Sequence, residues 1–153
     1  MRNLINKIDA GIIKHLHKLE VPLARIAIFV VYFWFGLLKL IGVSPATPLV
    51  ETLFNKTISF MSFEFFHTSF AVFEMLIGIL FLIKGFERLA IFLIGLHLIT
   101  TVMPLVFLPS STWQAFLVPT LEGQYIIKNI LIAASAVVVG STLVPIGRSI
   151  QKK

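Results

Sequence analysis

Four segments of about twenty mostly apolar residues constrain this chain more than any other feature, because a membrane-spanning helix needs a run of that length. The segments are Pro22–Ile41, Phe65–Ile83, Leu89–Pro109 and Gln124–Pro145. Apolar residues make up 58% of the chain and charged residues 13%, against roughly 45–50% and 25% in soluble domains. The 153 residues leave room for one domain and no soluble appendage. The sequence therefore predicts an all-α membrane protein, an antiparallel bundle of four transmembrane helices.

Short polar segments separate the four apolar ones. Pro22 suits the first turn of a helix, where its missing N–H costs nothing. The turn Lys84–Arg88 is so short that the second and third segments should form an antiparallel hairpin. The stretches Ser44–Pro48 and Leu108–Ser111 should end the first and third segments.

Loop charges predict the orientation, because loops rich in lysine and arginine stay in the cytoplasm. The loops that should be cytoplasmic carry Arg2, Lys7, Lys14, Lys18, Arg25, Lys84, Arg88, Arg148, Lys152 and Lys153, against Asp9, Glu20 and Glu87. The other two loops carry Glu51, Glu64 and Glu122 against Lys56. We therefore expect a multi-pass protein of the inner membrane with both termini cytoplasmic. The net charge of +6 then reflects loops that face anionic lipid, and we expect no nucleic-acid partner.

Residues 1–20 predict an amphipathic helix on the cytoplasmic membrane surface. The apolar residues at helical spacing are Leu4, Ile8, Ile12, Leu16 and Leu19, with Lys7, Lys14 and Lys18 on other faces. The alternative is a frayed polar tail. Residues 49–61 show a weaker pattern, which fits either a short helix on the outer face or an irregular loop.

Four ionisable residues fall inside the predicted spans: Lys39, Glu74, His97 and Lys128. A charge within a membrane costs roughly 2.5–3.5 kcal/mol, so such residues face the bundle interior or reach an interface, and they are functional candidates. At the rise of an α-helix, Lys39 should lie roughly 25 Å and Lys128 about 26 Å from the cytoplasmic side. Glu74 and His97 should lie near the midplane, at about 15 Å and roughly 14 Å.

The direction of the side chains predicts a Lys39–Glu74 pair. Helical side chains lean toward the N-terminus of their own helix, so Lys39 leans inward and Glu74 outward, toward a common depth. His97, on the neighbouring helix at the height of Glu74, is the expected third member. The alternatives are a snorkelling Lys39 or Lys128 and a His97 that is simply satisfied in the core.

Helical faces add further expectations. Arg25, Tyr32 and Lys39 recur every seven residues on the first span, with Gly36 adjacent. The second span has one stripe, which consists of Glu64, His67, Ala71, Glu74 and Gly78. The third places His97, Thr101 and Pro104 on one face. The fourth carries the small-residue stripe Asn129, Ala133, Ala136 and Gly140, which allows close helix packing.

Several chemistries are not supported by the sequence. The chain has no cysteine, which excludes a disulfide relay, a thiolate metal site and an iron–sulfur cluster built from this chain alone. His67 and His97 should differ in depth by well over 10 Å, too far to ligate one haem iron. No nucleophile–base pair, phosphate-binding loop or metal motif is present, so we expect no intrinsic cofactor and no enzymatic activity of the chain by itself.

Three blocks of the sequence resemble the DoxX-like family of small four-span membrane proteins. They are FWFGLLKL, FEMLIGILFLIKGFERLAIFLIGL and EGQYIIKNILI. The likeness is closest to the YkgB-like branch, also labelled reactive chlorine resistance protein C. It covers most of the chain from Arg25 onward. The matching residues are Gly36, Lys39, Glu74, Gly78, Gly123 and Lys128, with PLVFL from Pro104 and Trp113 also similar. Gln124 and Asn129 depart from the arginine and aspartate of that branch.

The resemblance implies a bacterial inner-membrane protein linked to oxidative stress or to quinone-dependent redox metabolism, and relatives occur as subunits of oxidoreductase complexes. On this view Lys39, Glu74, His97 and Lys128, with Tyr32 and Gly36 nearby, form a buried polar site for a quinone, a lipid or another small molecule. Membrane lipid and a membrane or peripheral oxidoreductase are the expected partners. The alternatives are a small transporter or channel subunit, which would need a homo-oligomer to conduct, and a purely structural bundle.

Overall fold

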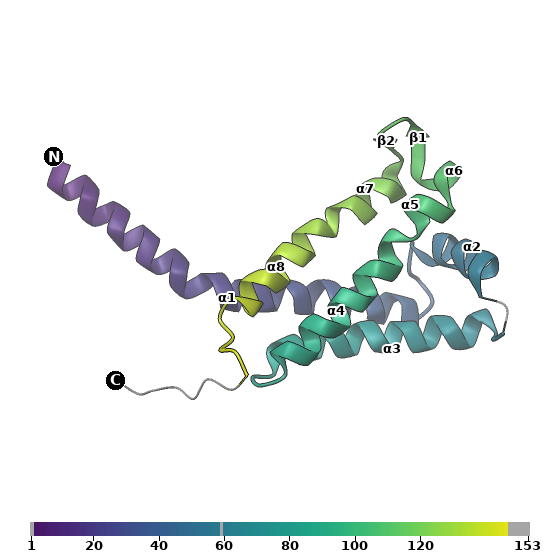
Figure 1. The fold of residues 1–153 in the computed structure, drawn as a ribbon, viewed down its shortest axis with the longest axis horizontal. Coiled ribbons are helices and arrows are strands. Elements are labelled where there is room, and N and C mark those ends of the chain that lie inside the picture. The colour runs from purple at the N-terminus through teal and green to yellow at the C-terminus, as the bar shows by residue number, and fades with distance from the viewer. Residues whose placement is uncertain (1, 59, 147–153) are drawn as a thin grey trace.

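The computed structural model describes residues 2–58 and 60–146 as a bundle of long helices (Figure 1). The elements in chain order are α1 (Arg2–Leu40), α2 (Thr47–Thr57), α3 (Phe63–Leu82), α4 (Glu87–Val102), α5 (Pro104–Phe107), α6 (Pro109–Thr112), β1 (Trp113–Ala115), β2 (Val118–Pro119), α7 (Leu121–Lys128) and α8 (Ile130–Gly140). Within these residues, four helical stretches are long and apolar enough to cross a membrane: α1, α3, α4 with α5, and α7 with α8. The predicted all-α four-helix architecture is confirmed. The basic residues Arg148, Lys152 and Lys153 lie outside the described residues.

The core is built by side chains from all four spanning stretches. Its buried members are Ile28, Tyr32, Ile77, Leu80, Phe81, Ala90, Ile94, Ala136 and Val139. The most extensive packing is between α1 and α3, and α8 then lies against α1 and α4. The short turn after α3 reverses the chain into α4, as the sequence predicts (Figure 1).

Glycines allow α1 and α3 to approach closely. A Cβ atom on Gly36 would lie 2.7 Å from Cγ of Met75 and 2.8 Å from the carbonyl oxygen of Ala71. A Cβ atom on Gly78 would lie 3.1 Å from the backbone nitrogen of Phe33. Both helices therefore meet almost backbone to backbone, which is how helices associate where lipid supplies no hydrophobic driving force.

The first spanning helix begins earlier in the chain than the sequence predicts. Pro22 does not start a helix but lies inside α1, which begins at Arg2. A proline within a helix removes one backbone hydrogen bond and bends the axis, and Figure 1 shows that α1 changes direction along its length. The helical conformation predicted for residues 1–20 is confirmed for the described part, whose residues 2–20 are all exposed.

The end of α1 is set by Gly42 rather than by the prolines that follow. The backbone amide of Val43 donates a hydrogen bond to the carbonyl of Leu38 at 3.0 Å, and the amide of Gly42 donates one to the carbonyl of Lys39 at 3.1 Å. These two bonds make a Schellman motif, in which the residue after the C-cap adopts a left-handed conformation that glycine tolerates best. Gly42 has a φ of 77°.

The end of the bundle opposite the α3–α4 turn is covered by short elements. The segment after α1 forms the short helix α2, where the sequence leaves a helix and an irregular loop open, and α2 packs against α3 and α5. The third span breaks before Pro104 and the fourth breaks at Asn129. The antiparallel strands β1 and β2, which the sequence does not predict, join α6 to α7.

Candidate functional site

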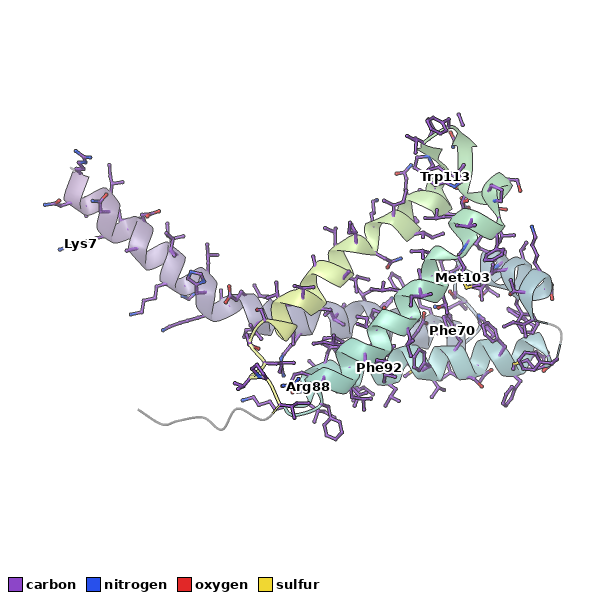
Figure 2. The ribbon with its side chains drawn as sticks, in the orientation of Figure 1. Lys7, Phe70, Arg88, Phe92, Met103 and Trp113 are labelled. Carbon is purple, nitrogen blue, oxygen red and sulfur yellow. The ribbon has the colours of Figure 1, made fainter. Side chains whose placement is uncertain are left out.

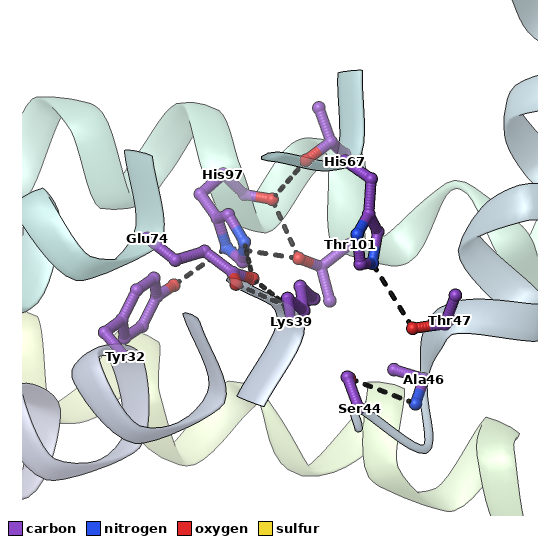
Figure 3. Close-up of polar contacts among 10 residues, drawn as sticks. Tyr32, Lys39, Ser44, Ala46, Thr47, His67, Glu74, His97 and Thr101 are labelled. Carbon is purple, nitrogen blue, oxygen red and sulfur yellow. Dashed lines mark hydrogen bonds and ion pairs between the residues drawn. The ribbon is translucent and has the colours of Figure 1, made fainter. Parts of the chain in front are cut away.

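A polar cluster lies inside the bundle, where α1, α3 and α4 meet. The ammonium nitrogen of Lys39 donates to both carboxylate oxygens of Glu74, at 2.6 Å and 2.5 Å (Figure 3). The two side chains are only 7% and 6% exposed. The predicted ion pair is therefore present and is shielded from the surroundings of the bundle. Pairing offsets much of the cost of each charge at this position.

His97 links this ion pair to the first helix. Its Nε2 lies 2.9 Å from Oε1 of Glu74, as the sequence predicts for the third member of the cluster. Its Nδ1 lies 2.9 Å from the hydroxyl oxygen of Tyr32 on α1. Tyr32, Lys39, Glu74 and His97 thus form one network of hydrogen bonds, which we call the polar cluster.

The hydrogen bonds of the polar cluster are consistent with a neutral histidine. A neutral imidazole has one donor nitrogen and one acceptor nitrogen. If Nε2 carries the proton, it donates to Glu74, and Nδ1 accepts the proton of the Tyr32 hydroxyl. Lysine and glutamate then cancel each other's charge, and every member has a partner. No buried side-chain nitrogen or oxygen among the described residues lacks a hydrogen-bond partner.

Helical spacing and the two glycines position the cluster. Tyr32 and Lys39 are seven residues apart, so both point from α1 toward the same side. Gly36 lies between them and lets α3 come close enough for Glu74 to reach Lys39. On α3 the predicted stripe is buried at His67, Ala71, Glu74 and Gly78, whereas Glu64 at its outer end is exposed.

The ammonium group of Lys39 retains unused hydrogen-bonding capacity. A lysine ammonium has three donors, and the contacts among the described residues use two of them, both on Glu74. The same nitrogen lies 5.6 Å from the centre of the Phe70 ring, which also stacks on His97 at 5.1 Å. The cluster therefore has one available donor, in a setting of stacked aromatic rings.

Lys128 does not belong to the polar cluster, contrary to the expectation for a common site. It is exposed on α7, and its ammonium nitrogen lies 5.1 Å from the centre of the Tyr125 ring. The fourth span approaches the bundle core through Ala136 and Val139, far along the chain from Lys128. Lys128 therefore does not line the interior of the bundle.

A second ion pair was not singled out by the sequence. Arg25 on α1 donates to the carboxylate of Glu87, which also accepts the amide of Gly85 at 2.7 Å. Their side chains are 15% and 10% exposed. Arg25 shares the seven-residue repeat of Tyr32 and Lys39, and that repeat was the available signal. Glu87 carries no such signal, because it lies in the polar turn Lys84–Arg88, where an acidic residue is expected to be solvated.

His67 lies apart from the polar cluster, toward α2. Its Nε2 is 3.3 Å from the hydroxyl of Thr47, and its ring packs on Phe63 with centroids 5.1 Å apart. Among the described residues, no group of three or more histidine, cysteine, aspartate or glutamate side chains is arranged to hold a metal ion.

Two open grooves lie elsewhere, along α4 and α8. One is lined by Ile91, Ile94, Gly95, Leu98, Ala133, Ala136, Val137, Gly140 and Ser141, and the other by Arg88, Ile91, Gly140, Leu143 and Pro145. Neither groove is lined by a member of the polar cluster. The cluster is therefore a closed network, and a ligand would reach it by displacing side chains around Lys39.

Comparison of the chain with protein-family models, with curated proteins and with solved structures found no match. Function must therefore be argued from the polar cluster and its setting.

Proposed function

We propose that this chain is a small accessory protein of the bacterial inner membrane, of the DoxX-like, oxidative-stress type, that binds the head group of a quinone at the polar cluster. The observation that carries the proposal is the buried network of Lys39, Glu74, His97 and Tyr32 inside a bundle of membrane-crossing length. Ionisable residues are expensive inside a membrane and mark functional sites there. The resemblance of the sequence blocks to the DoxX-like family supports the redox setting.

The chemistry of the cluster suits a quinone. A quinone presents carbonyl oxygens, which only accept hydrogen bonds, and the third N–H of Lys39 is a charged donor in an apolar setting. The Phe70 ring beside the ammonium already stacks on His97 and Phe66, so a quinone ring would take the place of one of these aromatic contacts. Glu74 and His97 would hold the ammonium in place, and the apolar tail of the quinone would extend into lipid.

Binding of a short-chain quinone tests this proposal directly. Purified protein in lipid nanodiscs is titrated with decylubiquinone, and the bound quinone is counted by native mass spectrometry and by extraction. We expect one quinone per chain in the wild type and a loss of binding in Lys39→Met. Lys128→Met is the matched control, since Lys128 is a membrane-helix lysine outside the cluster. Equal binding by both variants, or none by the wild type, contradicts the proposal.

A small transporter or channel subunit is the second candidate. It is favoured by the contact between His67 and Thr47, which continues polar side chains from the region of the cluster toward α2 (Figure 3). Substrate-dependent flux in proteoliposomes, abolished by Glu74→Leu, would support transport over quinone binding.

A further inference from the structure

The two grooves along α4 and α8 form one continuous surface feature. They share Ile91 and Gly140, and their volumes are about 410 Å³ and about 420 Å³. Small residues produce the groove, because Gly95 on α4 and Ala133 and Gly140 on α8 leave space that larger side chains would fill. We call this feature the α4–α8 groove.

The two ends of the α4–α8 groove differ in chemistry. Along most of its length the described lining is apolar, and it includes the hydroxyl of Ser141. At the end near the α3–α4 turn it is lined by Arg88, an exposed residue in the first turn of α4 (Figure 2). An apolar groove that ends at a guanidinium group is complementary to an acyl chain that carries an anionic head group.

The electrostatic setting of Arg88 favours an anion. Its acidic neighbour Glu87 is buried and bonded to Arg25, so it is not available to pair with Arg88. One N–H group of Arg88 donates to the backbone carbonyl of Val144, which leaves most of the five guanidinium donors for a ligand.

We propose that the α4–α8 groove binds one anionic phospholipid, with an acyl chain along α4 and α8 and the phosphate on Arg88. A guanidinium group binds phosphate oxygens in a bidentate manner, and basic residues between membrane helices recognise anionic head groups in this way. Arg88 lies at the first turn of a membrane-crossing helix, the level at which head groups lie. This site is separate from the polar cluster and does not depend on the quinone proposal.

The head-group contact is tested with lipids that differ only in charge. Detergent-solubilised wild type and Arg88→Gln are titrated with phosphatidylglycerol and with phosphatidylcholine of the same chains, and bound lipid is counted by native mass spectrometry. We expect Arg88→Gln to weaken phosphatidylglycerol binding by about fivefold and to leave phosphatidylcholine unchanged. Lys84→Gln is the matched control, because Lys84 carries the same charge in the same turn but does not line the groove.

The acyl-chain contact is tested by filling the groove. A Cβ atom on Gly95 would meet nothing within 4 Å, so the side chain of Gly95→Leu has room to project into the groove that Gly95 lines. We expect it to weaken the binding of both lipids, whereas Gly11→Leu, at another helical glycine with open space, changes neither. Circular dichroism and gel filtration establish that all variants fold.

Two results would overturn this inference. The first is unchanged selectivity for phosphatidylglycerol in Arg88→Gln. The second is a dimer in the same mass spectra that dissociates in Gly95→Leu while lipid binding stays unchanged, which would assign the groove to a second copy of the chain.

Discussion

The hydroxyl oxygen of Tyr32 on α1 lies 2.9 Å from Nδ1 of His97 on α4, and the other ring nitrogen of His97 lies at the same distance from Glu74 on α3. One imidazole ring thus connects three helices. A hydroxyl that donates to Nδ1 fixes the proton of a neutral histidine on Nε2, and Nε2 then donates to the carboxylate. Tyr32 consequently orients the ring that holds Glu74.

Removal of this hydroxyl should change the state of His97. In Tyr32→Phe the aromatic ring remains, but Nδ1 loses its Tyr32 partner, and the Thr101 hydroxyl, 3.2 Å from Nδ1, already donates to the carbonyl of His97. We expect a loss of stability of about 1–3 kcal/mol, the cost of an unsatisfied buried group. Nitrogen NMR of histidine-labelled protein should show a single Nε2–H tautomer in the wild type and a mixture in the variant. An unchanged spectrum would contradict the role given to Tyr32.

The Lys39–Glu74 pair should behave as a coupled unit. Lys39→Met and Glu74→Leu each strand a buried charge, so each should lower the stability by about 3–5 kcal/mol. The double variant removes both charges and should recover part of that loss. The measurement is thermal unfolding in detergent, with Lys128→Met as a control that should differ by less than about 0.5 kcal/mol. Simple addition of the two single effects would mean that the residues are not energetic partners.

Close approach of α1 and α3 should make Gly36 intolerant of a single methyl group. The Cβ of Gly36→Ala would lie 2.8 Å from the backbone oxygen of Ala71, so the helices must separate. We expect a loss of about 1–3 kcal/mol, although alanine favours helices. Gly95→Ala, which has open space around it, should instead be neutral or stabilising by up to about 1 kcal/mol. Equal melting temperatures for the two variants would show that the packing is not tight.

The two termini should lie in the cytoplasm. An even number of membrane crossings puts both ends on one side, and the distribution of lysine and arginine selects the cytoplasmic side. Reporter fusions at Lys153 and at Ser111 measure this: we expect cytoplasmic activity at Lys153 and external activity at Ser111. External activity at Lys153 would overturn the charge argument.

The first half of α1 should lie on the membrane surface. Ile12 is 54% exposed and several of its apolar neighbours are exposed as well, as in a helix whose apolar face is buried in the head-group region of a membrane. Because the chain has no cysteine, Ile12→Cys and Lys14→Cys can each be labelled selectively with a water-soluble maleimide. In liposomes Ile12→Cys should react several-fold more slowly than Lys14→Cys. Equal rates would place this segment in water.

The sequence predicts those parts of the fold that depend on the apolar composition of a segment and on the direction in which side chains lean along a helix. Four apolar segments and the short turn at 84–88 are enough for the helical bundle. The Lys39–Glu74 contact follows because one helix runs opposite to the other, so the two side chains lean toward each other. Helical spacing also places His97 and Thr101 together, and they are 3.2 Å apart at Nδ1 and Oγ1.

Other features depend on how the helices are rotated about their axes relative to one another. This rotation cannot be predicted from the sequence of any one segment. The Tyr32–His97 contact requires the rotation of α4 relative to α1, and that is set by packing. Charge and the family resemblance both group Lys128 with the site, yet the fourth span meets the core through its second half. Strands β1 and β2 are three and two residues long, too short for an alternating pattern. Pro22 predicts the start of a helix from local preference, but in the structure α1 extends on both sides of it.

The continuity of α1 has a mechanical consequence. Its exposed first half projects from the bundle (Figure 2, where Lys7 is labelled), and its second half carries Lys39. At about 1.5 Å per residue, the nineteen residues from Arg2 to Glu20 form a lever roughly 28 Å long, and a tilt of about 10° moves its tip by about 5 Å. The Arg25–Glu87 ion pair joins α1 to the start of α4 near the base of this projecting segment. A force on the tip, from a curved membrane or a docked protein, would therefore act on the same helix that holds the buried lysine.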